Sequence, residues 1–391
     1  MPDGALLLTG SGRLLCPAPA SSPWAILVRD GLVAWVGAAQ NAPVDDARRV
    51  DLGDALVTPG LVDAHSHPAF AGDRSDEVAA RLAGAAYTGG GIRRTVQSTR
   101  AASDDELLGL IERRLRAALA AGTTTIECKS GYGLDTAHEL RSLRLIGVAA
   151  QRVGINVVRT FLGAHAVPDG VAHHEYVELV ANEMLPAVAG EADFCDVFCD
   201  RGFFSLADAE RILEAAARHG LGLRMHADQL AATGAAQLAA RLGCASADHL
   251  EQLDADGIVA LAASSTVATL LPGPALVMRD RLPPARALLD AGALVALGSD
   301  ANAGTFGSPS MPLVIGLAAT LLGMTLTEAL AAATTGAAAS LSRTAIAGAI
   351  GPGMPADLVA WDAVHEGAFA LHLGAVRPRQ VWVAGRPMQP D

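Results

Sequence analysis

The feature of this sequence that most constrains its fold is a regular alternation of short apolar runs and amphipathic stretches between residues 60 and 348. The apolar runs have the length of strands and occupy residues 61–64, 123–128, 156–161, 194–198, 222–225, 245–248, 265–270 and 294–297. The stretches between them show helical periodicity, as in residues 104–120, 138–152, 206–219 and 284–291. Eight such units in about 290 residues predict an α/β fold, a (β/α)8 TIM barrel. A doubly wound sheet is the alternative, but it gives no reason for reactive residues at the ends of so many strands.

Both ends of the chain differ from this middle part, because they carry strand-like runs without helices between them. Near the N-terminus, residues 25–29 and 32–36 flank Asp30-Gly31, a dipeptide typical of tight hairpins. Near the C-terminus, residues 357–361 and 380–383 have the same character. The two ends suggest one small sheet built from both termini. We expect a small β-sandwich domain of residues 1–59 plus 350–391, beside a barrel domain of residues 60–349.

The composition excludes several classes of protein. Lys129 is the only lysine among the 29 cationic residues, so the chain cannot contain a phosphate-binding loop or a kinase-type ATP site. The formal net charge of −12 argues against a nucleic-acid partner. The 5 cysteines are scattered, the first residues lack the parts of a signal peptide, and no long apolar run occurs. These features predict a cytoplasmic protein with no membrane partner.

Histidines and a carboxylate stand at the ends of several predicted strands. His65 and His67 follow the first apolar run, and residues two apart on a strand share a face, so both can point at one metal ion. Alone, this pair also fits two surface histidines in a loop. However, His226 and His249 end two later strands and Asp300 ends the eighth, at the face where barrels carry their active sites. The set predicts a zinc or iron site whose bound water, with a pKa of about 7, acts as hydroxide.

At these residues the sequence resembles the amidohydrolase superfamily of metal-dependent hydrolases and, within it, the imidazolonepropionase family. The resemblance runs through nearly the whole chain and keeps the order of the motifs. It rests on Pro59-Gly60-Leu61-Val62-Asp63 with His65-Ser66-His67, Gly89-Gly90-Gly91-Ile92, Ala121-Gly122-Thr123-Thr124-Thr125, Lys129-Ser130-Gly131-Tyr132-Gly133-Leu134 and Gly163-Ala164-His165-Ala166-Val167-Pro168. The resemblance implies hydrolysis of the ring amide of 4-imidazolone-5-propanoate to N-formimino-L-glutamate in histidine degradation. It also implies a small-molecule substrate as the partner and a homodimer.

The resemblance further implies roles for individual residues. The implied ligands of one zinc or iron ion are His65, His67, His226 and Asp300. The implied catalytic residues are His249, Asp300 and Gln229. The implied substrate-binding residues are Arg74, Tyr132, His165, Gln229, Asn302, Gly304 and Thr305.

Three of these residues have a second interpretation from the residues themselves. Arg74 offers a bidentate fork for the propanoate tail of the substrate, but it could instead form a surface ion pair with Asp73 or Asp76. Tyr132 lies between two glycines, a setting that suits an exposed loop contact. His165 ends a predicted strand and is expected in the pocket, with a core histidine as the alternative.

Two positions shape the expected mechanism. Gln229 stands where many family members have glutamate, and a neutral amide orients substrate but cannot act as a base. We therefore expect proton transfer to fall to His249 and Asp300. Lys129 ends the second predicted strand, whereas binuclear members of the superfamily carry a metal-bridging carboxylated lysine on a middle strand. A mononuclear site is therefore predicted, in which Lys129 could support a carboxylate by its charge.

Two other functions stay open at this stage. A related cyclic amidase or deaminase would act on another small heterocycle with an acidic tail. This alternative stays open because of Gln229, because residues 301–305 lack the proline that the family often has before the glycine, and because residues 272–281 contain no aromatic residue. An inactive amidohydrolase-like assembly scaffold is the alternative from a different class. The intact set of predicted ligands argues against a scaffold, which has no need of them.

Overall fold

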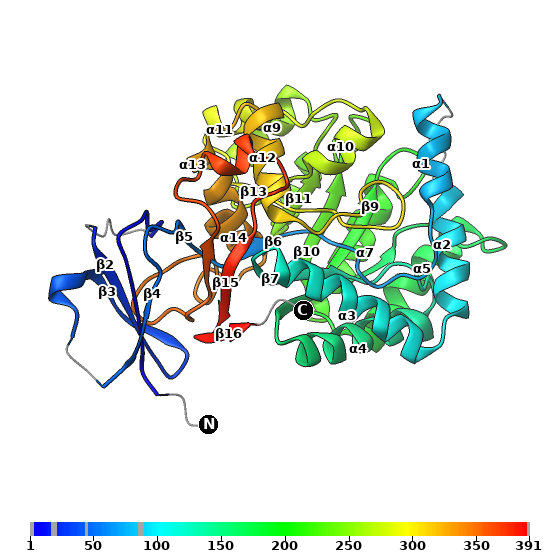
Figure 1. Ribbon diagram of the computed structural model, residues 1–391. Helices are drawn as coiled ribbons and strands as arrows, with labels where there is room; N and C mark the ends of the chain where they lie inside the picture. Colours follow the sequence, from blue (N-terminus) through cyan, green and yellow to red (C-terminus); the bar gives the residue numbers. More distant parts are fainter. Residues whose placement is uncertain (1–3, 17–21, 44–45, 85–89, 389–391) are drawn as a thin grey trace.

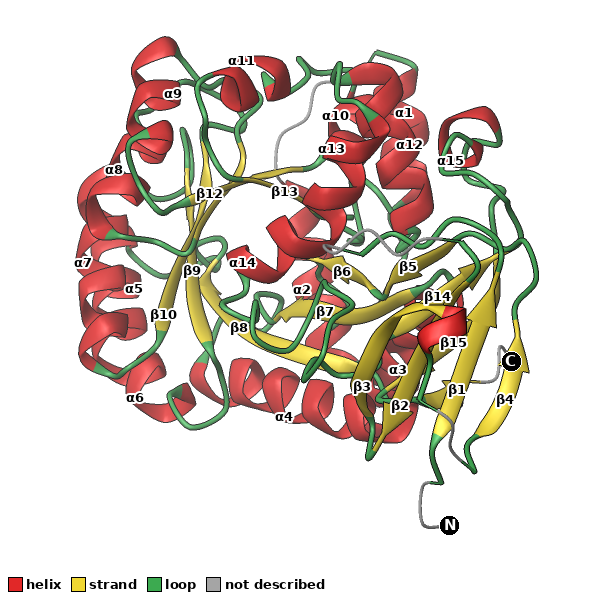
Figure 2. Ribbon diagram, turned by 90° about the vertical axis from the view of Figure 1, so that its left-hand side faces the viewer, coloured by secondary structure: helices red, strands yellow, loops and turns green. Residues whose placement is uncertain are grey.

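The computed structural model describes residues 4–16, 22–43, 46–84 and 90–388; Gly89 and the segments 1–3 and 389–391, which belong to predicted motifs or domains, lie outside the described residues. The larger part is a nearly closed barrel of 8 parallel strands surrounded by helices (Figure 1, Figure 2). In chain order its strands are β6 (Leu61–Asp63), β7 (Thr123–Lys129), β8 (Asn156–Ala164), β9 (Phe194–Cys199), β10 (Gly222–Ala227), β11 (Ser246–His249), β12 (Val267–Leu270) and β13 (Val295–Leu297). A bridge between Ser66 and Ala301 joins the ends of the first and last strands. The predicted TIM barrel is confirmed.

Several strands extend further toward their C-terminal ends than the apolar runs predict. β8 reaches Ala164 rather than residue 161, β10 reaches Ala227 rather than residue 225, and β11 includes His249. In β8 the added residues are Leu162, Gly163 and Ala164, so the predicted run stopped too early. In β10 and β11 the added residues include His226 and His249, which stay in the sheet because their side chains are buried inside the barrel.

Helices cover the outside of the barrel, as the amphipathic stretches predict. They are α1 (Ser75–Leu82), α2 (Gly90–Ala101), α3 (Asp104–Ala120), α4 (Thr136–Val153), α5 (His173–Leu179), α6 (Leu185–Val188), α7 (Leu206–Arg218), α8 (Ala235–Leu242), α9 (Ala255–Ala262), α10 (Pro272–Met278), α11 (Ala285–Asp290), α12 (Met311–Leu321), α13 (Leu326–Ala331), α14 (Ala337–Ser340) and α15 (Ala368–Leu371), with short η1 (Ala39–Asn41), η2 (Val180–Met184) and η3 (Ala332–Gly336). Helix α3 begins with a capping box of Ser103 and Glu106, and its buried Leu107, Ile111 and Leu115 recur every four residues on the inner face. None of the described helices combines the length and the apolarity needed to cross a membrane.

The termini form two small sheets rather than one. The first, with strand order β3-β2-β1-β4, contains β1 (Leu6–Gly10), β2 (Trp24–Arg29), β3 (Leu32–Ala38) and β4 (Arg48–Asp51). The second, with order β16-β15-β14-β5, contains β5 (Val57–Pro59), β14 (Leu358–Trp361), β15 (Pro378–Val383) and β16 (Arg386–Met388). The second sheet is the expected sheet built from both termini, because β5 pairs with β14. The expectation missed that the other N-terminal strands form a sheet of their own, in which β1 pairs with β2 and β4.

The two terminal sheets nevertheless share one core. Trp24 and Ile26 of the first sheet belong to the same buried cluster as Leu358 and Trp382 of the second. This packing gives the predicted β-sandwich, which lies to one side of the barrel (Figure 1). The exact domain limits, residues 1–59 plus 350–391 and residues 60–349, stay a prediction.

Candidate metal centre and substrate pocket

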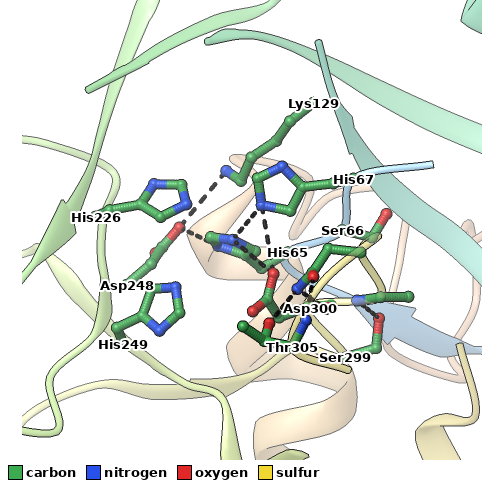
Figure 3. Close-up of polar contacts among 12 residues, drawn as sticks. His65, Ser66, His67, Lys129, His226, Asp248, His249, Ser299, Asp300 and Thr305 are labelled. Atoms are coloured by element: carbon green, nitrogen blue, oxygen red, sulfur yellow. Dashed lines mark hydrogen bonds and ion pairs between the residues drawn. The ribbon is translucent and has the colours of Figure 1, made fainter. Parts of the chain in front are cut away.

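The ends of three barrel strands bring the predicted metal ligands together (Figure 3). His65 and His67 follow β6, His226 lies on β10, and Asp300 follows β13. The Nε2 atoms of His65 and His67 lie 3.1 Å apart, and Oδ1 of Asp300 lies 3.3 Å from Nε2 of His67. The ring centroid of His226 lies 4.6 Å from that of His65. All four side chains are buried, so the cluster is a compact centre and not a pair of surface histidines.

The chemistry of this cluster fits a metal ion. Nδ1 of His65 lies 2.7 Å from Oδ2 of Asp248, and an ionised carboxylate only accepts, so Nδ1 carries the proton and Nε2 presents its lone pair. Burial holds the pKa of His65 well below its ordinary value, which keeps the ring neutral. His65, His67 and Asp300 each offer a ligand atom within 4.8 Å of the others, and so do His65, His226 and His249. Imidazole nitrogens and a carboxylate oxygen that converge in a buried space are the donors that zinc and iron take.

Two buried carboxylates contact the Nδ1 atoms of His65 and His226. Besides Asp248 at His65, Oδ2 of Asp196 lies 3.0 Å from Nδ1 of His226. Asp196 also accepts a hydrogen bond of 3.2 Å from the backbone N–H of His226. Carboxylates in this position fix the orientation and the tautomer of a ligating ring. Neither Asp196 nor Asp248 was among the predicted site residues.

These carboxylates belong to a network of charges inside the barrel. Nζ of Lys129 lies 2.6 Å from Asp196, 2.7 Å from Glu127 and 3.7 Å from Asp248, and Nη2 of Arg224 lies 3.1 Å from Asp248. All five side chains have an exposed fraction of 0%. Burial acts to lower the pKa of Lys129, but Asp196 and Glu127 outweigh it and hold that pKa above its ordinary value. The sequence contained an indication of this network, because Glu127 and Lys129 lie two residues apart on one strand and therefore share its inward face.

Hydrogen bonds fix the ends of the first and last barrel strands, and two residues near the strand ends have a strained backbone. Asp63 accepts two hydrogen bonds from Ser299, of 2.8 Å from its N–H and 2.6 Å from its Oγ–H, and so ties the first strand to the last. Burial raises the pKa of Asp63 to about 7. His249 and Asp300 have φ angles of 82° and 48°, in the left-handed region that costs a residue other than glycine about 1–3 kcal/mol. Two strained residues at one centre indicate that the fold fixes them there for function.

His249, the predicted catalytic histidine, has a buried carboxylate partner that the sequence analysis missed. Oε1 of Glu251 lies 3.3 Å from Nδ1 of His249, and both side chains are buried. Burial acts to lower the pKa of His249, but Glu251 outweighs it, so this pKa lies above the ordinary value. Because Glu251 engages Nδ1, the other ring nitrogen of His249 remains available to the pocket.

A pocket beside the ligands gathers nearly all of the predicted substrate-binding residues. It is lined by His67, Arg74, Ile92, Tyr132, His165, Phe198, His226, Gln229, His249, Asp300, Asn302 and Thr305. Nδ1 of His165 lies 2.9 Å from the carbonyl oxygen of Gly131, so it carries the proton, and burial lowers the pKa of His165 to about 3. His165 is therefore neutral, with Nε2 as an acceptor, and its ring stacks on His67 with centroids 5.5 Å apart.

Arg74 supplies the permanent cation among the described residues that line this pocket. It is only 4% exposed, and its Nε and Nη2 donate hydrogen bonds of 3.1 and 2.9 Å to Oε2 of Glu77. Arg74 thus forms an ion pair, but its partner is Glu77 and not Asp73 or Asp76. The first turn of α1 places Glu77 three residues on, next to the guanidinium. Nη1 of Arg74 is not used in this contact.

Two glycines make room for the Arg74–Glu77 pair. A Cβ atom on Gly91 would lie 2.0 Å from Nη2 of Arg74, and one on Gly304 would lie 2.4 Å from its Cζ. Gly304, predicted to contact substrate, lies outside the residues that line the pocket and packs on Arg74 instead. Gly91 and Gly304 are therefore required to be glycines for the same reason, because both backbones approach the guanidinium of Arg74 too closely for a side chain.

Tyr132 is buried, with an exposed fraction of 3%, so the expectation of an exposed loop contact is wrong. Its ring packs 5.2 Å from His165 and 6.0 Å from Phe70. Gly131 has a φ angle of 103°, and Glu139 accepts hydrogen bonds from the N–H groups of Gly131 and of the two residues that follow Tyr132. This tight turn, built on a buried carboxylate from α4, directs the ring inward.

Asn302 uses its side chain within the loop in which it lies. Its Nδ2 donates to the carbonyl of Asp300 and to Oγ1 of Thr305, and its Oδ1 accepts from the N–H groups of Gly304 and Thr305, with distances of 2.6–2.8 Å. The residue therefore shapes the loop wall beside Asp300. Gln229 reaches the pocket from the end of β10, where its backbone N–H donates a 2.9 Å hydrogen bond to Asp200.

Comparison with known families and sequences gives a consistent picture. Residues 56–388 match the Amidohydrolase family. The imidazolonepropionase of Salinispora arenicola is 47% identical over 385 residues, which cover 97% of this chain and 96% of that protein. The imidazolonepropionase of a Polaromonas species is 44% identical, with 95% of this chain and 90% of that protein covered.

Solved structures share the fold at much lower identity. A 5-methylcytosine deaminase from Klebsiella pneumoniae has a TM-score of 0.80 at 15% identity, covering 98% of this chain and 97% of its own. An adenosine deaminase from Xanthomonas campestris with bound zinc has a TM-score of 0.74 at 20% identity, covering 98% and 92%. These likenesses support the barrel and its accessory domain.

Proposed function

The chain belongs to the amidohydrolase family and, within it, to the imidazolonepropionases, and from this premise we propose how its residues carry out the reaction. It is a hydrolase that opens the ring amide of 4-imidazolone-5-propanoate to N-formimino-L-glutamate in histidine degradation. The observation that carries the proposal is a buried cluster suited to a metal ion that shares one pocket with a single arginine. Relatives of this one kind over nearly the whole chain favour this reaction over that of another heterocycle hydrolase or a scaffold.

The metal ion is the first component of the mechanism, and His65, His67, His226 and Asp300 would hold it. When bound, it lowers the pKa of a water molecule and so supplies the nucleophile, while it also polarises the ring carbonyl. The imidazole-rich donor set supports zinc or iron over magnesium or calcium, which take oxygen ligands. A single ion is supported by Lys129, the one lysine, whose ammonium is engaged by carboxylates and is not available as a bridging ligand.

The pocket then binds and orients the substrate. Arg74 binds the propanoate tail through the free side of its guanidinium, because a planar fork matches a carboxylate. His165, neutral with Nε2 as acceptor, takes a hydrogen bond from a ring N–H of the substrate. Gln229 donates its amide N–H to a substrate oxygen, and Tyr132 closes the side of the pocket next to His165.

Proton transfer falls to His249 and Asp300. The pKa of Asp300 lies below its ordinary value, since His67 and His249 outweigh the effect of burial, and the ionised carboxylate can take the proton of the attacking water. His249, held at Nδ1 by Glu251, can give a proton to the ring nitrogen as the C–N bond breaks. Water thus adds its oxygen to the carbonyl carbon as the C–N bond breaks. The proton taken up by Asp300 replaces the one that His249 gives to the nitrogen, and the second water proton leaves with the new carboxyl group.

Turnover of freshly generated imidazolone propanoate tests the proposed reaction directly. We expect its ultraviolet absorbance to disappear with formation of N-formimino-L-glutamate, and the rate to fall on chelation and return with added zinc or iron. Metal analysis of protein purified without chelator should give about one equivalent, as a mononuclear site requires. Two tightly held ions, or turnover that survives complete removal of metal, would contradict the mechanism.

The location and assembly of the enzyme are also proposals. A cytoplasmic location is supported by the five cysteines, all within the described residues, because the structure joins none of them in a disulfide. Fractionation of cells that express the protein tests this. A homodimer is proposed from the family resemblance, and sedimentation of the purified protein tests it.

A further inference from the structure

Two chains of contacts run from buried cations to the proposed metal ligands. In one, Nζ of Lys129 lies 2.6 Å from Oδ2 of Asp196, and the same oxygen lies 3.0 Å from Nδ1 of His226. In the other, Nη2 of Arg224 lies 3.1 Å from Oδ2 of Asp248, which lies 2.7 Å from Nδ1 of His65. Figure 3 shows Lys129 directed at this cluster from its own strand.

The two cations have different main partners. Asp248 has Arg224 at 3.1 Å and Lys129 only at 3.7 Å, so its charge is balanced mainly by Arg224. Asp196 has Lys129 at 2.6 Å as its close cation. Removing one partner of a fully buried pair leaves an uncompensated charge, so the remaining group is driven away from its position. Asp196 therefore depends on Lys129 more than Asp248 does.

Asp196 contacts His226 at two points. It contacts the ring at Nδ1 and accepts a hydrogen bond of 3.2 Å from the backbone N–H of the same residue. Any shift of this carboxylate thus moves both the strand position and the ring of His226. A displaced Asp196 would also withdraw the carboxylate that faces Nδ1, so the ring of His226 could turn its Nε2 away from the metal.

We propose that Lys129 is a positioning residue for the metal centre, which acts through Asp196 to hold His226 and thereby sets the affinity for the ion. This inference rests on the proposed function in one respect, that the histidine cluster holds a metal. It assigns a task to Lys129 that neither catalysis nor substrate binding uses. The position of Lys129 supports this separation, since its side chain is fully buried and does not line the pocket.

The experiment measures zinc affinity of the full-length protein by competition with a chromophoric chelator. Wild type is compared with Lys129→Met, Asp196→Asn and the double variant, after circular dichroism has verified that each is folded. We expect each single substitution to weaken zinc binding about 10- to 100-fold, as loss of an outer partner of a ligand does. The double variant should bind zinc about as well as Asp196→Asn, because two substitutions on one path are not additive.

A matched control separates this role from general packing. Glu127 is as buried as Asp196 and contacts the same ammonium at 2.7 Å. Its other oxygen accepts a 3.1 Å hydrogen bond from the backbone N–H of Ser66, and the amide oxygen of a glutamine can accept the same bond. Glu127→Gln should therefore keep wild-type zinc affinity. In cobalt-substituted protein, the visible ligand-field bands should change in Lys129→Met and stay unchanged in Glu127→Gln.

The outcomes separate this inference from the proposed function. A wild-type protein that retains no metal overturns both. A wild type that binds zinc tightly, with Lys129→Met binding equally tightly, overturns only the role of Lys129. If Lys129→Met does not fold, Asp196→Asn is compared with the double variant, which loses one charge of each sign. A further tenfold loss in the double variant would then show that Lys129 does not act through Asp196.

Discussion

Replacing Arg74 by methionine should raise KM for the substrate while leaving kcat nearly unchanged. Arg74 is 4% exposed and lines the pocket, so no other permanent cation among the described lining residues replaces it. A hydrogen bond to a charged group contributes about 1.5–3 kcal/mol, which corresponds to about a 10- to 150-fold change in KM. Because Glu77 shares the guanidinium at 2.9 Å, we expect the lower end of this range.

The structure supplies two matched variants for this prediction. Glu77→Gln removes the competing carboxylate and should lower KM, because the whole charge of Arg74 then serves the substrate. Gly304→Ala places a methyl group where it would lie 2.4 Å from Cζ of Arg74, so it should raise KM by displacing the guanidinium. Glu77 is 31% exposed at its side chain, so water can solvate it when Arg74 is removed and the fold should persist.

Initial rates over a range of substrate concentrations, followed by the loss of ultraviolet absorbance, provide the assay. A substrate analogue that lacks the propanoate should react equally slowly with wild type and Arg74→Met. An Arg74→Met enzyme with an unchanged KM, or one that loses kcat alone, would refute the assignment of Arg74 to the substrate carboxylate.

Three further changes test other parts of the mechanism and the fold. In steady-state kinetics, His249→Ala should lower kcat about 10²- to 10⁴-fold, the usual contribution of a general acid or base. Glu251→Gln should lower kcat less. Full activity of His249→Ala would remove this residue from the mechanism. Gln229→Glu should retain activity, because the glutamate side chain has the same length and can still form hydrogen bonds in the pocket, and an inactive, metal-loaded variant would contradict this. Burial raises the pKa of Asp357 from 3.8 to about 6, so folding holds its proton and wild type loses stability as pH rises through this window. Asp357→Asn should therefore gain up to about 3 kcal/mol relative to wild type between acid and neutral pH, measured by denaturant unfolding; a pH-independent difference would count against it.

The sequence was sufficient to predict the barrel and the clustering of the proposed ligands. β6 and β13 are buried, mostly apolar runs, and His65 and Asp300 follow them closely, so the pattern of strands places both residues at one face of the barrel. The ends of the strands were harder to predict. In β10 the segment continues through His226 to Ala227, because inward polar side chains have charged partners within the barrel and need no water.

The residues that the sequence did not reveal depend on contacts between distant segments. Asp196 becomes a site residue only because Lys129 and His226, from two other strands, lie beside it. Tyr132 is buried because Glu139 on the following helix caps the turn around it. A local sequence pattern shows the residue types but not which distant residues they will contact. Neither the contacts of Asp196 with Lys129 and His226 nor the inward turn at Tyr132 therefore follows from the spacing.

The charge balance of the site explains how an acidic protein takes an acidic substrate. Inside the barrel, the three carboxylates of Glu127, Asp196 and Asp248 contact two cations, Lys129 and Arg224, and the ionised Asp300 adds a further negative charge at the centre. Without a metal ion, this group of charges therefore repels an anion. A divalent ion cancels the excess negative charge, so that the centre no longer opposes the attraction of Arg74 for the substrate carboxylate. The negative interior thus favours the metal, and the metal together with Arg74 creates the site for the substrate carboxylate, so substrate affinity depends on metal occupancy as well as on the arginine.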